Sequence, residues 1–263
     1  MARLIVLQML LVLAAHEAHS EPQNEKLPTP KEIVAILQSG DGTAKELIAK
    51  RLGFAENRGE LISADLEFDS ITLNHVVLET PGPHVVIHAT CTSCWRGYIA
   101  VLEPSGNDRW RHLDTVVVGG KHRKPKVSVR NIVGAAESEI VIQENEVFTG
   151  TGMWQYNLSI LKLHAGRLEA IFDEPEEVNF AVPFTGDKGF YNTEQTQKSE
   201  FLFSTPSDGN SHPLLIYEKQ IIKVHDQAVS RWRVFYWDAN LCRYVHNPIA
   251  RPDTPLGALR PIP

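Results

Sequence analysis

Three stretches of this chain repeat one plan of short apolar runs separated by turns. They span residues 76–113, 127–171 and 201–246, and each closes with an aromatic-led run, a turn and an arginine-led run. Self-similarity of this kind is typical of stacked copies of one β unit. The sequence therefore predicts a mainly β fold with three blade-like antiparallel repeats, arranged as an incomplete propeller or as a sandwich-like stack. A repeat is a scaffold, so it indicates no function by itself.

The apolar pattern changes from helical to alternating at Leu61. Alternation with a period of two is typical of strands with one buried face, so residues 55–247 are predicted to form the β-repeat domain, with a partial copy at 61–75. Tight glycine turns such as Ala165-Gly166 join the last two strands of a repeat. Two longer connections, at residues 121–126 and 178–198, are predicted to be loops.

Residues 29–54 carry the signals of a helical hairpin. Thr29 supplies an N-cap hydroxyl, Pro30 suits the first helical position, and Glu32 can bond back to the cap. The first helix is predicted to end near Gln38. Thr43 and Glu46 repeat the capping pattern, and Gly53 suits the end of the second helix.

The first 20 residues have the pattern of a secretory signal. Arg3 supplies a positive start, residues 4–15 form an apolar run, and Ala18-His19-Ser20 suits cleavage. A membrane anchor is the alternative reading, but the run is shorter than the roughly 20 residues that cross a bilayer. We therefore expect a secreted or periplasmic protein with no membrane span after signal removal. Residues 21–28 are predicted to be a flexible leader, and residues 248–263 a proline-rich extended tail.

The three cysteines are Cys91, Cys94 and Cys242. An oxidising compartment favours disulfides over metal thiolates, and the close spacing of Cys91 and Cys94 permits a local bridge. Cys242 could instead pair with either of them, and the sequence does not choose. A zinc site with His88 is the alternative, but no fourth ligand is evident, so no metal is expected.

The order of each repeat, from a polar glycine turn through an aromatic-led strand to an arginine-led strand, resembles the FG-GAP and VCBS type repeats of integrin-like β-propellers, especially degenerate versions in exported bacterial proteins. The resemblance covers residues 66–247. In that family the first turn carries an acidic calcium-binding loop followed by a glutamate. Here only the third turn keeps an acidic fragment, Asp208-Gly209-Asn210, and only the second keeps the glutamate, Glu139. Because calcium takes about six to eight oxygen ligands, no calcium site or other cofactor is expected.

Aromatic residues recur at equivalent strand starts, where symmetry could gather them into a platform for a glycan or a peptide. The alternative is packing between layers. The candidate platform comprises Trp95, Tyr98, Trp154, Tyr156 and Trp232. Arg109, Arg167 and Arg243 also recur, and the apolar residue after each is predicted to point the other way, into the core.

No nucleophile with a base, paired carboxylates or phosphate-binding glycine loop can be assembled from sequence neighbours, so no catalytic residue is predicted. A net charge of −6 argues against nucleic acid as a partner. The sequence favours an exported, non-catalytic protein that binds a protein or a glycan. A hydrolase or lyase with a site assembled from loops, and a structural subunit that completes its sheet with a partner chain, are the alternatives; either could be oligomeric.

Overall fold

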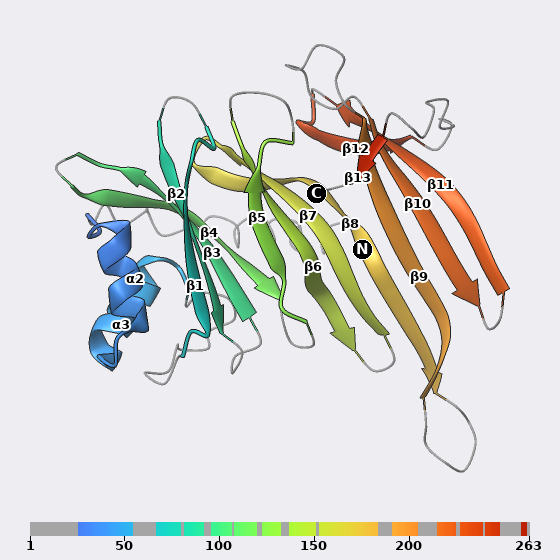
Figure 1. Ribbon diagram of the computed structural model, residues 1–263, viewed down its shortest axis with the longest axis horizontal. Helices are drawn as coiled ribbons and strands as arrows, with labels where there is room; N and C mark the ends of the chain where they lie inside the picture. Colours follow the sequence, from blue (N-terminus) through green and yellow to red (C-terminus); the bar gives the residue numbers. More distant parts are fainter. Residues whose placement is uncertain are drawn as a thin grey trace, which may run out of the picture.

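The protein is a stack of antiparallel β-sheets with a helical hairpin at one end (Figure 1). In the computed structural model, the described residues are 26–54, 67–79, 82–91, 96–106, 108–119, 123–132, 137–150, 153–183, 191–204, 215–224, 227–238, 240–247 and 259–261. The predicted signal segment, residues 1–20, lies outside this range. No helix in the described part of the chain has the length and apolar character needed to cross a membrane.

The helical hairpin forms as predicted at its first cap. Helix α2, Pro30–Gln38, begins after Thr29, whose Oγ1 accepts a hydrogen bond from the Glu32 amide, and the Glu32 carboxylate accepts one from the Thr29 amide at 2.9 Å. Helix α3 spans Gly42–Arg51. The prediction of Thr43 as its N-cap is wrong. Asp41 is the N-cap, and its carboxylate accepts a hydrogen bond from the Ala44 amide at 3.1 Å. Gly53 follows the helix with a φ of 69°, as its predicted role requires.

The first repeat is a four-stranded sheet in the order β1-β2-β3-β4. Its strands are Ser70–Val76, His84–Cys91, Arg96–Pro104 and Trp110–Gly119. The predicted start of the first repeat at residue 76 is wrong: β1 ends at Val76 and pairs with β2 from Ser70 onward. The expected partial copy at residues 61–75 therefore supplies most of β1, whereas residues 61–66 lie outside the described range.

The second and third repeats each form four successive antiparallel strands that share one nine-stranded sheet. The second comprises β5, Lys126–Arg130; β6, Glu139–Gly150; β7, Met153–His164; and β8, Arg167–Pro183. The third comprises β9, Tyr191–Ser204; β10, Leu215–Val224; β11, Gln227–Asp238; and β12, Arg243–Asn247. From the predicted tail, β13, Leu259–Pro261, pairs with β9.

The expectation of a loop at residues 178–198 is wrong at both of its ends. Strands β8 and β9 pair through this segment, from Glu177 opposite Lys198 to Pro183 opposite Tyr191. Backbone pairing in a projecting hairpin does not require the alternation of apolar residues that marks a core strand. The polar sequence of this segment therefore gave no signal of strand formation. Residues 184–190, between them, are outside the described range.

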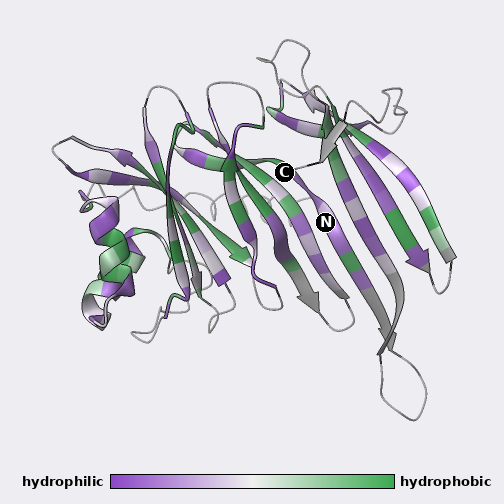
Figure 2. Ribbon diagram, in the orientation of Figure 1, coloured by the Kyte–Doolittle hydropathy of each residue, from purple (hydrophilic) through white to green (hydrophobic). Residues whose placement is uncertain are grey.

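The layers follow one another in chain order, and the ribbons carry apolar residues where they face each other (Figures 1 and 2). Each pair of successive layers shares an apolar cluster. Residues of α2 and α3, such as Ile33 and Leu37, pack on one face of the first sheet. The other face meets β6 and β7 through Val86, Ile99, Ile142 and Leu161, among others. A third cluster joins β6–β8 to β9–β12; its buried members are Val141, Leu158, Ile160, Ile171, Phe172, Phe201, Ile216, Phe235 and Tyr244. The predicted mainly β fold, a sandwich-like stack of repeats after a helical hairpin, is confirmed.

One residue of the predicted flexible leader belongs to the fold. Leu27 is 1% exposed and exchanges two backbone hydrogen bonds with Trp110, of 2.8 and 3.1 Å. The expectation that residues 21–28 carry no structure is therefore wrong at Leu27. An isolated apolar residue among polar ones gives no periodic signal, so its burial depends on a distant strand that the local sequence does not reveal.

Gly119 lies at a close approach between the first and second layers. A Cβ atom placed there would lie 1.9 Å from the Glu146 carbonyl oxygen. We expect Gly119→Ala to lower the free energy of unfolding by about 1–3 kcal/mol, because the backbones must move apart. Urea unfolding followed by tryptophan fluorescence measures this loss. Gly40→Ala is the matched control, since no atom lies within 4 Å of its added Cβ; equal midpoints for the two variants would contradict the prediction.

Candidate functional site

The third repeat ends in a strand that is only partly paired. Strand β11 pairs with β10 from Gln227 to Tyr236, whereas β12 pairs with β11 only at residues 234–238. Among the described strands, residues 227–233 of β11 thus have a neighbour on one side alone. Figure 1 shows this part of β11 at the outer border of the last layer. An edge strand of this kind presents backbone N–H and C=O groups to which another chain can bind. We call residues 227–233 the open edge.

The side chains of the open edge are exposed where the strand projects beyond β12. Ala228, Val229, Ser230 and Arg231 are all exposed, and 63% of Val229 is accessible. Tyr236, further along β11, is 37% exposed, and Leu241 in the following turn is 53% exposed. These three apolar side chains make up half of the large apolar residues found exposed in the described chain. Val229 and Tyr236 are seven residues apart on β11 and point to opposite faces of the strand, so the exposed apolar side chains lie at separate points along the border of the third repeat.

Two cations lie at the open edge without matching carboxylates. Lys223 and Arg231 are exposed, lie on opposite faces of the sheet, and form no ion pair with a described acid. Lys219 is half-buried and lies across from Glu200 of β9. The Arg231 Nε donates to the side-chain oxygen of Gln220, a neutral group. The edge therefore carries positive charge on a protein whose net charge is −6.

The basic connector at residues 121–126 contrasts with this edge. Arg123 donates to Glu177 at 2.7 Å and stacks 4.4 Å from the centre of the Tyr156 ring. Lys126 pairs with Glu144 at 2.7 Å. The bond to Glu177 raises the pKa of Arg123, although burial acts in the opposite direction. These two cations are already neutralised by the second repeat, so they are poorly suited to attract an anionic ligand.

A buried polar cluster fixes the strands behind the open edge. The Glu218 side chain is fully buried and accepts bonds from Ser199 at 2.6 Å, Gln220 at 2.7 Å and Arg233 Nε at 2.6 Å. Arg233 also pairs with Glu174 of β8 at 2.7 Å. Because Glu218 is sealed from solvent and both of its oxygens accept bonds, it cannot reach a substrate. The cluster instead ties β8, β9, β10 and β11 together.

The pKa shifts of this cluster follow from burial and pairing. Burial raises the pKa of the Glu174 carboxyl, and the Arg233 bond opposes that rise only in part. Burial by itself would lower the pKa of the Arg233 guanidinium, but the bonds to Glu218 and Glu174 raise it above its ordinary value. Arg233 also lies 5.0 Å from the centre of the Phe235 ring. The guanidinium therefore stays charged and holds the two carboxylates.

The described aromatic residues of the predicted platform lie in three different repeats. Tyr98 is 3% exposed and stacks on Phe54 under the helices, with ring centres 4.8 Å apart. Tyr156 is equally buried, in the second repeat. Trp232 is half-buried beside Tyr217 and Val234 in the third repeat. Trp154 is half-buried on β7, and Trp95 lies outside the described residues, so ligand binding by these two indoles stays a prediction.

The recurring arginines have the arrangement that the sequence predicts. Arg109, Arg167 and Arg243 are exposed. The residues that follow them, Trp110, Leu168 and Tyr244, pack into the three separate apolar clusters between the layers. The alternation along each strand therefore places charge outside and apolar groups inside, as predicted.

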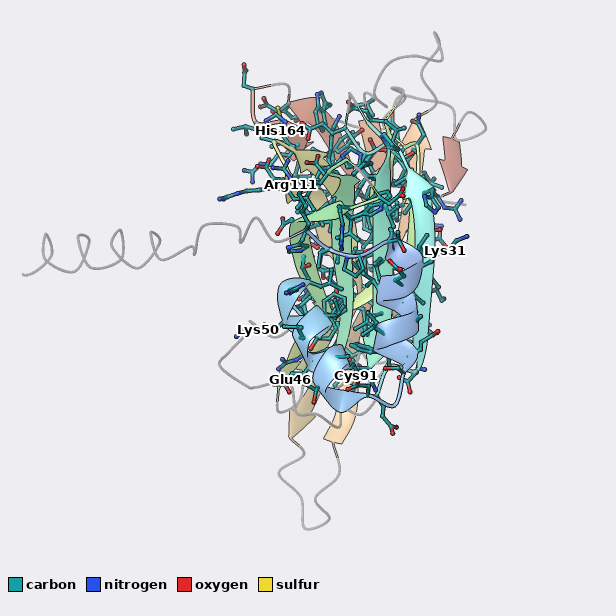
Figure 3. All side chains as sticks on the ribbon, turned by 90° about the vertical axis from the view of Figure 1, so that its left-hand side faces the viewer. Lys31, Glu46, Lys50, Cys91, Arg111 and His164 are labelled. Atoms are coloured by element: carbon teal, nitrogen blue, oxygen red, sulfur yellow. The ribbon has the colours of Figure 1, made fainter. Side chains whose placement is uncertain are left out.

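The cysteines lie in different layers. Cys91 ends β2 and is 1% exposed, whereas Cys242 is exposed in the turn before β12. Figure 3 shows Cys91 near the helical end of the molecule. Cys94 is outside the described residues, so the bridge between Cys91 and Cys94 stays a prediction. No group of His, Cys, Asp or Glu that could hold a metal occurs in the described segments.

The open edge and the polar cluster behind it were both missed by sequence reasoning. A local signal for the cluster existed, because Glu218 and Gln220 occupy every second position between Ile216 and Ile222 and so lie on the same face of β10 as these apolar residues. Polar residues at core-facing positions of a strand indicate a buried network. The open edge has no such signal, since it depends on where β12 stops.

Comparisons of this chain with models of protein families, with curated proteins and with solved structures found no match. The resemblance to integrin-like repeats therefore stays a prediction. The fold, the open edge and its charges are the observations from which a function can be argued.

Proposed function

We propose that this protein is an exported, non-catalytic binding protein that recognises another protein through its third repeat. The signal pattern of residues 1–20 supports export to the periplasm or the cell exterior. The single observation that carries the recognition surface is the exposure of Val229, Tyr236 and Leu241 on β11 and its turn. Every earlier layer contributes its apolar residues to a cluster shared with the next layer.

Binding through this surface has a direct test. Tyr236 is replaced by a photoreactive phenylalanine, and the protein is irradiated with the secreted and envelope fractions of the cells that produce it. We expect a covalent adduct with a distinct protein, because aromatic residues on exposed patches are the contacts that partners bury. The matched control carries the same group at Leu47, an exposed residue of α3 at the opposite end of the stack. Equal labelling at the two positions, or none at Tyr236, would overturn the proposal.

A further inference from the structure

We infer that the partner contributes an extended acidic peptide segment, which pairs with the open edge of β11 as an additional strand beyond β12. This inference rests on the proposed function and names the kind of segment that is bound. Addition of a strand to an exposed sheet edge is a recurring mode of peptide recognition, in which main-chain bonds supply affinity and side-chain pockets supply specificity.

In the described part of the chain, no strand occupies the side of β11 beyond the end of β12. Strand β12 ends at Asn247, opposite Val234 of β11. The open edge continues from Arg233 back to Gln227, and at about 3.3 Å per residue it can pair with a segment of roughly six residues.

The edge is held ready for pairing by the residues behind it. Strands β10 and β11 pair without interruption from Leu215 opposite Tyr236 to Val224 opposite Gln227. Arg233, at one end of the open edge, is fixed by its bonds to Glu218 and Glu174. A strand that is rigid before binding loses little conformational freedom when a partner pairs with it.

Charge selects the chemistry of the segment. Arg231 lies on the open edge, opposite Gln220, and forms no ion pair with a described carboxylate. Lys223 of the neighbouring strand β10 lies opposite Ala228 and so adds positive charge on the other face of the sheet. Opposite charges placed across from each other stabilise a strand pair, whereas like charges destabilise it. A glutamate or aspartate of the added strand that lies across from Arg231 would therefore stabilise the pairing, and residues of the other parity would lie on the face of Ala228 and Ser230.

The same charges disfavour a second copy of this chain at the edge. Antiparallel pairing of two open edges about Ser230 would place Arg231 opposite Val229 of the other copy, with the two Arg231 side chains as diagonal neighbours. A polysaccharide could approach the lysines, but it has no main-chain amides with which to continue the ladder. An acidic peptide can form backbone hydrogen bonds with the open edge and can also neutralise its positive charge.

The test measures fluorescence anisotropy with the intact protein and a labelled peptide of about ten residues that alternates valine and glutamate. We expect saturable binding that weakens as salt is added, and much weaker binding of the matched peptide with lysine in place of glutamate. Lys223→Glu combined with Arg231→Glu should weaken binding of the acidic peptide roughly tenfold or more. Lys50→Glu, on α3 at the helical end (Figure 3), is the control and should bind unchanged.

Proline substitutions separate strand pairing from simple charge attraction. Successive N–H groups of a strand point to opposite edges, so one of Val229→Pro and Ser230→Pro disturbs the β10 ladder and the other removes only an outward donor. The variant that keeps the native urea midpoint should lose peptide binding. If that variant binds as tightly as the parent protein, or if acidic and basic peptides bind equally, the inference is wrong.

Two other results would overturn this inference while leaving the proposed function in place. Cross-linking from Tyr236 to a partner, together with no binding of the acidic peptide, would show recognition by another part of the third repeat. Self-association of the protein alone, measured by sedimentation and abolished by Arg231→Glu, would assign the edge to a second copy. If Tyr236 forms no cross-link but the acidic peptide still binds, the proposed recognition surface at Tyr236 and Leu241 is wrong and the inference about the open edge stands.

Discussion

Replacing Arg233 with methionine should lower the free energy of unfolding by about 3–5 kcal/mol, because it leaves a buried carboxylate without its counter-charge. The Glu218 side chain is 0% exposed and that of Arg233 is 21% exposed, so water cannot take over the role of the guanidinium. Urea unfolding at neutral pH measures the loss. A residual bond from Ser199 and one from Gln220 remain in the variant, but neutral donors compensate a carboxylate less than a cation does.

The matched control is Arg231→Met, two residues along the same strand. Arg231 is exposed, but it donates to the neutral oxygen of the buried Gln220, so its loss should cost about 1–2 kcal/mol, less than the loss of Arg233. Adding Glu218→Gln to Arg233→Met should restore part of the stability, because the buried charge disappears with its partner. A loss below about 1 kcal/mol for Arg233→Met would mean that the pair behaves as a surface ion pair.

Acid should destabilise the fold through His88. This side chain is 7% exposed in β2, its Nε2 has no hydrogen-bond partner within the described chain, and burial lowers the pKa of its imidazole to about 4. An unfolded histidine has a pKa of about 6.5. Between these two values the unfolded chain binds the proton and the folded chain does not, so stability falls as the pH falls. The full contribution is present above about pH 6.5 and is lost by about pH 4, a change of about 3 kcal/mol.

His88→Leu isolates this contribution. The free energies of unfolding of the parent and the variant, measured from pH 7 to pH 4, should diverge by about 3 kcal/mol toward acid, with the variant the less sensitive. His84 acts in the same direction, because burial lowers its pKa while nearby glutamates oppose the shift, so part of the acid sensitivity should persist in the variant. His75→Gln, on an exposed position of β1, is the control. Parallel pH profiles for the parent and His88→Leu would contradict the assignment.

Local signals predicted the parts of the fold that local chemistry determines. The cap formed by Thr29 and Glu32, the helix end at Gly53 and most strands of the three repeats follow from residues that are close in the sequence. Burial of Tyr98 and Tyr244 follows from alternation along their strands, and the packing between layers was the alternative to an aromatic platform.

Features that depend on register or on distant strands could not be predicted. The bond between Arg233 and Glu218 requires β10 and β11 to pair in one particular register. The pairing of β8 with β9 beyond Glu177 and the burial of Leu27 also depend on partners far along the chain. The open edge depends on where β12 ends, which becomes visible only when the two strand lengths are compared. For these reasons the scaffold was predictable and the candidate site was not.

The order of the layers has a consequence for how the polypeptide matures. Each repeat packs against the one made just before it, so a nascent chain that emerges amino end first can shelter every sheet soon after its synthesis. Strand β9 also pairs with β13, Leu259–Pro261, which is made more than 50 residues later. The border of β9 at residues 202–204 is therefore covered only after residues 259–261 have been synthesised, and deletion of those three residues should leave it uncovered.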